Sequence, residues 1–460
     1  MSLRVVVIGA GIAGLATAHR LLRAPGAPEV LVLEARDRVG GKISSASVGG
    51  LELEAGPDSL LARKPWAVEL CRELGLGDDL VAPTSAQAQV YGRAGLVRFP
   101  SGPYGISTDL LELLRWPGMS YAGKVRAGLD LVLPRRHDEG DESLGSLLRR
   151  RIGAEATGTL VAPLLGGLFA GDVDRLSVRA TFPELAAWER ERGSLIRGAR
   201  AASSAARATR STGSPPPPMF LRLRGGLRRL TDALAAEVGA ERLSPGTSAT
   251  SVRREGEGFV VVAGGREVAA DAVVLATPAF VSADLLGEVA PGVGSALRSI
   301  PHVSTAVVLL VYADGTGTTL PNSSGFVAPL GALEVTAATL VSRKWPDPAF
   351  GDRAVIRAFV GAVGTERWVE ADDAELVARV ARQLAELYPL PTRPSSAQVV
   401  RWPRAMPQYE VGHLERVRAI EDGLPEGVFV VGQAYRGTGI PDCVMQADAV
   451  AERVLAVTGA

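Results

Sequence analysis

The chain has 460 residues, more than one compact core usually serves, so we expect two or three structural units. Lysine plus arginine and aspartate plus glutamate each number 50, which argues against nucleic acid as the main partner because phosphate neutralisation needs a basic surplus. The two cysteines, Cys71 and Cys443, argue against a disulfide framework and favour a reducing, cytoplasmic location, while four scattered histidines lack metal-ligand spacing, so no metal site is expected.

The first predicted unit is a strand, a helix and a second strand between residues 4 and 34. Val5–Ile8 and Val30–Leu33 are continuous apolar runs, which are typical of buried parallel strands. The residues between them that recur at helical spacing are Ile12, Leu15, Ala16 and Leu22. This order predicts a βαβ unit.

A helical region is predicted next. Residues 107–210 are rich in Leu, Arg, Ala and Glu, and the stretch of small residues and prolines at 201–218, which overlaps their end, predicts a linker. No apolar run in the chain approaches the ~18–20 residues of a membrane span, which leaves a peripheral membrane contact open.

The second half of the chain predicts strands with two further helices. In chain order these are short strands within Thr250–Ala276, strands at 303–312 and 354–360, a helix at Asp372–Leu387, a strand at Val428–Val431 and a helix at Pro441–Val457. The strand that ends before Ala276–Pro278 is expected to return to the sheet of the first unit.

Three glycines follow the first strand in the pattern Gly9-x-Gly11-x-x-Gly14. Gly9 allows a tight turn, Gly11 lets the backbone approach a pyrophosphate, and Gly14 lets the helix pack closely on the sheet. The helix N-terminus then presents unpaired N–H groups to the phosphates. Glu34 ends the second strand, where a carboxylate accepts hydrogen bonds from the adenosine ribose. The combination predicts a Rossmann-type dinucleotide site.

The segment that follows indicates whether the dinucleotide is FAD or a nicotinamide cofactor. It reads Glu34-Ala35-Arg-Asp-Arg38-Val-Gly40-Gly41-Lys42, an extension that a nicotinamide enzyme does not need. It resembles the E-x-x-x-R-x-G-G-[RK] segment of FAD enzymes in the flavin amine oxidase superfamily. There the paired glycines let the chain pass close to the flavin and pyrophosphate, and the basic residues balance phosphate charge. The resemblance implies FAD as the cofactor.

A second glycine-rich turn lies near the C-terminus. It spans Gly432–Gly439 after a predicted strand, and Pro441 stands where a helix would begin. The N-terminus of that helix, aimed at the flavin pyrimidine ring, would stabilise the negative charge of the reduced flavin. Cys443 raises the alternative of a covalent flavin link, but a packed small residue is the favoured interpretation, so FAD is expected to bind non-covalently.

Longer motifs carry a narrower resemblance that runs almost end to end. The specific ones are GLFAGDVDRLS followed by TFP within Gly166–Pro183, and PQY followed by GHLERV from Pro407. They accompany Glu54–Lys64, Trp402–Tyr409 and Gly432–Cys443. On these residues the chain resembles the oxygen-dependent porphyrinogen oxidases of haem synthesis, which act on protoporphyrinogen or coproporphyrinogen.

The resemblance implies an α/β fold. It comprises a Rossmann-type two-dinucleotide-binding FAD domain, an α+β substrate domain and an inserted helical domain. The predicted boundaries are 1–82, 222–280 and 400–460 for the discontinuous FAD domain, 83–210 for the helical insert, 211–221 for the linker and 281–399 for the substrate-binding β-sheet domain.

The motifs and the resemblance together predict the FAD contacts. These are Gly9, Ala10, Gly11, Ile12, Ala13, Gly14, Glu34, Ala35, Arg38, Gly40, Gly41, Lys42, Gly56, Pro57, Asp58, Ser59, Val252, Trp402, Gly432, Thr438, Gly439 and Ile440. Two positions depart from the family. Gln433 stands where Asn is commoner, and Asp58 stands where animal members carry an Arg thought to meet a substrate propionate.

For the substrate, the resemblance implies a porphyrinogen that loses six electrons, with molecular oxygen reoxidising the flavin to give hydrogen peroxide. No catalytic acid, base or nucleophile is identified, because the cofactor and the gain of aromaticity supply most of the chemistry. The candidates for an apolar wall, with ordinary core packing as the alternative, are Leu168, Phe169 and Phe326. The candidates for binding propionates are Arg63 and Lys64.

The choice of porphyrinogen rests on charge and on a short motif. Leu61-Ala62-Arg63-Lys64 is similar to the sequence found in the Gram-positive branch of the family, many of whose members act on coproporphyrinogen. Coproporphyrinogen carries four propionates and protoporphyrinogen two, so a site for coproporphyrinogen is expected to contain more cations. Coproporphyrinogen III is therefore favoured, with protoporphyrinogen IX as the alternative. An amine oxidase, a carotenoid desaturase and a non-catalytic relative of the same fold are less favoured. A transient contact with the next haem-pathway enzyme and the oligomeric state remain open.

Overall fold

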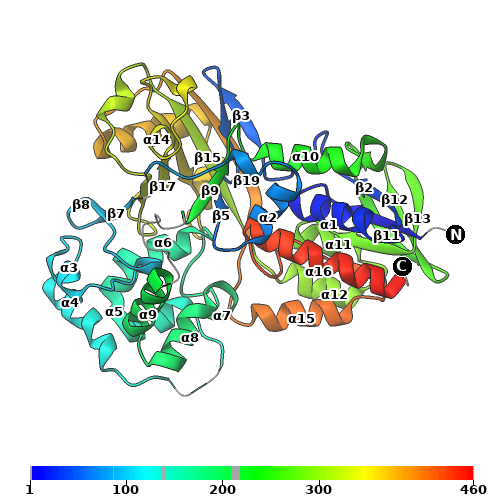
Figure 1. Ribbon diagram of the computed structural model, residues 1–460, viewed down its shortest axis with the longest axis horizontal. Coiled ribbons are helices and arrows are strands. Elements are labelled where there is room, and N and C mark those ends of the chain that lie inside the picture. Colours follow the sequence, from blue (N-terminus) through cyan, green and yellow to red (C-terminus); the bar gives the residue numbers. More distant parts are fainter. Residues whose placement is uncertain (1–2, 86, 137, 139, 209–217, 459–460) are drawn as a thin grey trace.

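The computed structural model describes residues 3–85, 87–136, 138, 140–208 and 218–458. Figure 1 shows three regions: a sheet covered by helices near both termini, a second sheet at the upper left, and a group of helices at the lower left. In the first region the N-terminal helix α1 (Ile12–Arg23) packs beside the C-terminal helix α16 (Ile440–Thr458), so the two ends of the chain build one unit. None of the described helices is long and apolar enough to cross a membrane.

A five-stranded parallel sheet forms the centre of the first region, in the order β10-β2-β1-β14-β20. Its strands are β1 (Arg4–Ile8), β2 (Glu29–Leu33), β10 (Leu243–Ser244), β14 (Ala272–Leu275) and β20 (Val428–Val430). Val5–Ile8 is buried on both faces of the sheet, which explains its continuous apolar run. The predicted βαβ unit and the predicted return of the chain before Ala276 are both confirmed.

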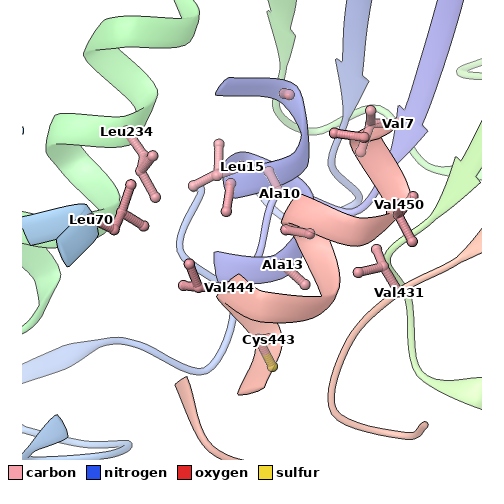
Figure 2. Close-up of a cluster of buried hydrophobic side chains, with 14 of the residues drawn as sticks. Val7, Ala10, Ala13, Leu15, Leu70, Leu234, Val431, Cys443, Val444 and Val450 are labelled. Atoms are coloured by element: carbon pink, nitrogen blue, oxygen red, sulfur yellow. The ribbon is translucent and has the colours of Figure 1, made fainter. Parts of the chain in front are cut away.

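Helices cover both faces of this sheet. On one face lie α1, α2 (Trp66–Glu73), α10 (Arg228–Val238) and α16. On the other lie α11 (Ala279–Leu285), α12 (Pro291–Arg298), α15 (His413–Gly423) and a small sheet of β11 (Ala249–Glu255), β12 (Gly258–Ala263) and β13 (Arg266–Ala270). Figure 2 shows part of the first core, where side chains such as Leu15, Leu70, Leu234 and Val444 gather between the helices that carry them.

The second sheet has seven strands in the order β19-β15-β18-β17-β16-β7-β8. They are β7 (Ala88–Gly92), β8 (Gly95–Arg98), β15 (His302–Val311), β16 (Gly325–Val327), β17 (Val335–Leu340), β18 (Val355–Val360) and β19 (Ser396–Pro407), with α14 (Asp373–Leu387) packed on one face. β7 and β8 fall inside the region 83–210 predicted as mainly helical. They are strands because β7 pairs with β16, a partner that local sequence does not reveal. The domain boundaries themselves stay a prediction.

The remaining part of that region is helical, as predicted. It contains α3 (Leu110–Arg115), α4 (Tyr121–Gly128), α5 (Leu144–Ala156), α6 (Ala162–Gly167), α7 (Val178–Thr181), α8 (Pro183–Arg192) and α9 (Leu195–Ala208). The predicted linker 211–221 lies largely outside the described residues. Its last two residues begin β9 (Phe220–Leu223), which pairs with β5 (Leu60–Leu61) and β6 (Leu80–Val81).

Candidate active site

The three glycines of the first motif lie where β1 ends and α1 begins. Gly9 has φ of 108°, and a Cβ at Gly14 would lie 1.9 Å from the Gly9 carbonyl oxygen, so both positions need glycine. Gly11 caps α1 without a side-chain hydrogen bond, and a Cβ there would meet no atom closer than Gly41 Cα at 4.0 Å. The space beyond the helix N-terminus therefore fits a phosphate group.

The second glycine pair closes against the first. Gly40 donates its N–H to the carbonyl of Ala10 at 2.8 Å, and a Cβ at Gly41 would lie 3.1 Å from Gly11 Cα. Arg38 donates from Nη2 to the carbonyl of Gly41 at 3.2 Å. The two motifs, separate in the sequence, thus form one backbone cradle of the kind a pyrophosphate requires.

Glu34 is held at the edge of this cradle. Its Oε2 accepts the N–H of Ala10 at 2.8 Å, and its Oε1 accepts the N–H of Arg36 at 3.0 Å. Each carboxylate oxygen keeps a second lone pair. The side chain is therefore fixed by the backbone and can still accept hydrogen bonds from a ribose, as the spacing predicts.

Lys42 connects the cradle to residues 432–439, the glycine-rich turn that is predicted to face the flavin and is called the flavin-facing turn below. Its Nζ donates to the carbonyl of Ala405 at 2.7 Å and to Oε1 of Gln433 at 2.5 Å. Burial lowers the pKa of Lys42 to about 8, and among the described residues no carboxylate forms an ion pair with it. Gln433, noted in the sequence only as a departure from Asn, thus serves as a neutral acceptor for this ammonium group.

The predicted contact segment Gly56–Ser59 passes close to Lys42, since a Cβ at Gly56 would lie 1.9 Å from the Lys42 carbonyl oxygen. Within it, Asp58 pairs with Lys344 Nζ at 3.1 Å and Arg357 Nη1 at 3.3 Å. Burial opposes ionisation of Asp58, but the two cations outweigh it and hold the pKa of this carboxyl well below its usual range.

Sequence reasoning missed both of these cations. Arg357 lies on β18 of the second sheet, and Lys344 ends α13 (Val341–Lys344), the short helix between β17 and β18. Arg357 also donates to the carbonyl of Gly56. No sequence motif includes either residue. The only indication in the sequence was Asp58 itself, a carboxylate in a segment expected to contact FAD, because a buried carboxylate needs cationic or hydrogen-bonding partners.

The N-terminus of α16 is capped by Asp442. Its Oδ2 accepts the N–H of Gly439 at 3.1 Å, and its Oδ1 accepts from Lys64 Nζ at 2.5 Å. Thr438 and Gly439 remain partly exposed at this helix end. Lys64, predicted to bind a propionate, therefore already has an ion-pair partner on the helix predicted to face the flavin.

A row of aromatic side chains links the predicted wall to the other predicted propionate partner. The ring centroids of Phe169 and Phe182 lie 6.0 Å apart, and those of Phe182 and Tyr104 lie 5.7 Å apart. Arg63 Cζ lies 5.3 Å from the centroid of the Tyr104 ring, and its ion pair with Glu184 is long, at 3.8 Å. Two predicted substrate residues, Phe169 and Arg63, are thus connected through two that the sequence analysis did not name.

The other two wall candidates lie in different environments. Leu168 is 55% exposed, whereas the neighbouring Phe169 is only 6% exposed and belongs to the core of the helical region. Phe326 is 2% exposed, and its ring contacts Tyr388 in the core of the second sheet at a centroid distance of 6.2 Å. This burial favours the alternative of ordinary core packing for Phe326, and Phe169 could meet a substrate only through the small exposed part of its ring.

Two further predicted cofactor positions, Val252 and Trp402, are buried, and so is Cys443. Val252 lies in the core on β11, and Trp402 donates from Nε1 to the carbonyl of Ala55 at 2.8 Å, directly before Gly56. Cys443 is buried on the first turn of α16, in the cluster of Figure 2. Burial raises the pKa of this thiol to about 12, so it is not nucleophilic near neutral pH. Among the described residues, no three His, Cys, Asp or Glu side chains could together hold a metal ion.

Comparisons with known proteins identify the family of this chain. The family model described as flavin containing amine oxidoreductase matches residues 12–455. The coproporphyrinogen III oxidase of Bacillus subtilis (strain 168) is 33% identical over 461 residues, which cover 98% of this chain and 97% of that protein. The coproporphyrinogen III oxidase of Propionibacterium freudenreichii subsp. freudenreichii is 35% identical, covering 98% and 90%. The chloroplastic protoporphyrinogen oxidase of Oryza sativa subsp. japonica is 29% identical, covering 95% and 85%.

Solved structures of related proteins share the fold of this chain. A crystal structure from Exiguobacterium sp. 255-15, of a protein provisionally described as a protoporphyrinogen oxidase, superposes with a TM-score of 0.85 at 32% identity over 99% of both chains. Putrescine oxidase, at 18% identity and a TM-score of 0.72, shares the fold.

The fold and the backbone cradle define a flavin-dependent oxidoreductase. The chain belongs to the flavin containing amine oxidoreductase family and, within it, to the group formed by the coproporphyrinogen III and protoporphyrinogen oxidases.

Proposed function

We propose that this protein oxidises coproporphyrinogen III to coproporphyrin III, with FAD as its cofactor and molecular oxygen as the electron acceptor. The observation that carries the proposal is the match to coproporphyrinogen III oxidases along 98% of the chain, on a cradle that fits FAD. The reaction removes six electrons and six protons from the macrocycle, and three molecules of oxygen take them up to form three molecules of hydrogen peroxide.

The residues of the chain contribute binding and orientation. FAD, when bound, supplies the two-electron redox chemistry. Gly9–Gly14, Glu34 and Gly40–Lys42 would hold it. Phe169 would pack against the macrocycle and keep water away from the reacting face. No side chain is assigned the role of a general base.

The flavin is proposed to bind non-covalently, and the environment of Cys443 supports this. A flavin thioether would need the thiolate as a nucleophile, whereas burial raises the pKa of Cys443 to about 12. Its side chain packs among the apolar residues of the first core.

The choice between porphyrinogens turns on cations available to propionates. Lys64 has a close partner in Asp442 at 2.5 Å, whereas Arg63 is exposed and has Glu184 at 3.8 Å. Arg63 is therefore the better candidate for a propionate, because a substrate carboxylate would displace a weaker partner. Its position at the end of the aromatic row from Phe169 supports the same role.

The test is to compare kcat/KM for coproporphyrinogen III and protoporphyrinogen IX on the unmodified holoenzyme. A higher value for coproporphyrinogen III is expected, with peroxide formed in air and no turnover on addition of NAD(P) without oxygen. A preference for protoporphyrinogen IX would reverse the substrate choice and leave the flavin assignment intact.

Peripheral membrane contact is a further part of the proposal, and an apolar face on the helical region supports it. The large side chains exposed there, all at least 40% exposed, are Leu111, Leu114, Tyr121, Val125, Leu129 and Val132. Arg115 and Arg135 are exposed near these side chains, Glu112 is half-buried and Asp130 is buried, while Asp109, which caps α3, is exposed. Exposed apolar side chains with cations beside them are typical of binding to anionic lipid.

Vesicle flotation tests this contact. Vesicles that contain phosphatidylglycerol should retain the protein and neutral vesicles should not, and Val125→Asp combined with Leu129→Asp should abolish retention. Retention by neither vesicle type would overturn the membrane contact and favour a protein at this surface, such as the enzyme that takes up the product.

A further inference from the structure

Two stacked rings contact three backbone groups of the flavin-facing turn. The hydroxyl of Tyr409 donates to the carbonyl of Gln433 at 2.7 Å and accepts the N–H of Gly437 at 2.9 Å. Nε2 of His413 lies 2.9 Å from the carbonyl of Tyr435. The two rings stack with centroids 3.9 Å apart and an interplanar angle of 13°. Alternate residues of the turn are thus held from one side.

The hydrogen-bond roles of this pair follow from the partners. Nδ1 of His413 is buried without a partner, so Nε2 carries the proton and donates to the carbonyl of Tyr435. Burial lowers the pKa of His413 to about 4, which keeps the ring neutral. Burial also raises the pKa of Tyr409 well above its usual value, so its hydroxyl stays a donor.

The position of the histidine is set by its helix. Gly412, with φ of 83°, turns the chain so that His413 becomes the first residue of α15. The N–H of His413 bonds back to the carbonyl of Glu410 at 2.9 Å. The orientation of the His413 ring is therefore fixed by the backbone geometry and by stacking on Tyr409.

The same tyrosine also contacts the helical region. Its ring centroid lies 5.7 Å from that of Phe169, the predicted substrate wall. The carbonyl of Tyr409 accepts the N–H of Ser177 at 2.7 Å, and the neighbouring Gln408 donates from Nε2 to the carbonyl of Phe169 at 2.8 Å. One residue therefore touches both the flavin-facing turn and the wall.

We propose that Tyr409 and His413 are positioning residues, a clamp that fixes the flavin-facing turn relative to Phe169 and so sets the distance between flavin and substrate. The inference rests on the proposed function for its effect on turnover. Its effect on the flavin is independent of the substrate. Neither residue is assigned a chemical step.

Tyr409→Phe removes the hydroxyl and keeps the ring. Two buried backbone groups then lose their partner, so the dissociation constant of FAD should rise about tenfold to hundredfold. At saturating FAD, kcat should fall by about tenfold while KM for coproporphyrinogen III stays within about twofold. The visible circular dichroism of the bound flavin should change.

Tyr312→Phe is the matched control. Tyr312 is fully buried in the core of the second sheet, and its hydroxyl has no hydrogen-bond partner in the structure. Its variant should keep the wild-type FAD constant, flavin spectrum and kcat.

Two variants of His413 separate its donor from its stack. His413→Gln can retain a donor near the position of Nε2 and loses the stacked ring, whereas His413→Phe retains a ring and loses the donor. We expect His413→Gln to keep most of the FAD affinity and His413→Phe to lose about tenfold.

A purely structural role gives a different result. It would lower the unfolding temperature of the Tyr409→Phe protein and leave its FAD constant, flavin spectrum and kcat unchanged, and that result overturns the clamp. If the wild-type protein fails to oxidise either porphyrinogen, the proposed function is wrong, yet the FAD constant and spectrum of the variants still test the clamp.

Discussion

Replacing Gly11 with alanine should separate cofactor binding from folding. Gly11 has φ of −75° and ψ of 178°, which alanine adopts without strain, and the new Cβ would meet no atom closer than 4.0 Å. The unfolding free energy of the apoprotein should therefore change by less than about 1 kcal/mol, because the restriction of the unfolded chain by alanine is offset by its weaker preference for the N-cap position.

FAD binding should respond much more strongly. The added methyl group enters the space that the pyrophosphate needs beside the N-terminus of α1. Losing a charge-assisted hydrogen bond between backbone and phosphate costs about 1.5–3 kcal/mol. The dissociation constant of FAD should accordingly rise about 10- to 150-fold.

Two further glycines give the contrast and the control. A Cβ at Gly14 would lie 1.9 Å from the Gly9 carbonyl oxygen, so Gly14→Ala should destabilise the apoprotein itself by about 1–3 kcal/mol or more. Gly292 lies on α12 with no atom within 4 Å of its added Cβ, so Gly292→Ala should leave the FAD dissociation constant unchanged and raise the unfolding free energy by no more than about 1 kcal/mol. Thermal unfolding of the apoprotein and fluorescence titration with FAD measure the two effects. Wild-type FAD affinity in Gly11→Ala would refute the assignment of the phosphate site.

Three other predictions concern acid stability, flavin attachment and substrate charge. Because the folded pKa of His413 is lowered from 6.5 to about 4, the unfolded state binds a proton first as the pH falls, so about 3 kcal/mol of stability should be lost between those values. His413→Gln should flatten that part of a denaturant-monitored pH profile, and an unchanged slope would contradict the pKa. Acid precipitation should release all the flavin, and Cys443→Ser should keep the wild-type absorbance; flavin left on the pellet would show a covalent link. Arg63→Met should raise KM for coproporphyrinogen III by more than Lys64→Met does, by the equivalent of about 1–3 kcal/mol; the reverse order would identify Lys64 as the propionate partner.

The parts of the fold that the sequence predicts well are those with local patterns. The run Val5–Ile8, the glycines after it and Glu34 lie within one βαβ unit, where hydrophobic period and turn chemistry agree. The C-terminal helix was predictable for the same reason. Its apolar residues pack on α1, and Pro441 marks its first turn.

The parts that were missed depend on partners distant in the chain. β7 and β8 are short strands whose pairing with β16 replaces a helical expectation. The pairing of Asp58 with Lys344 and Arg357 joins the first and second sheets, and no spacing rule relates such positions. The sequence places Tyr409 in a family motif, but its two hydrogen bonds to the flavin-facing turn are visible only in the folded structure.

The charges around the site bear on why a member of an amine oxidase family would act on a porphyrinogen. Lys344 and Arg357 share the carboxylate of Asp58, and the buried Glu54 also acts on Arg357, whereas Lys42 contacts two neutral acceptors. A buried cation without an anionic partner is costly, so Lys42 favours ligands that bring negative charge. The diphosphate of FAD and the carboxylates of a porphyrinogen meet that requirement. A protonated amine would add a cation to the same region, and its binding would be opposed by the charges already there.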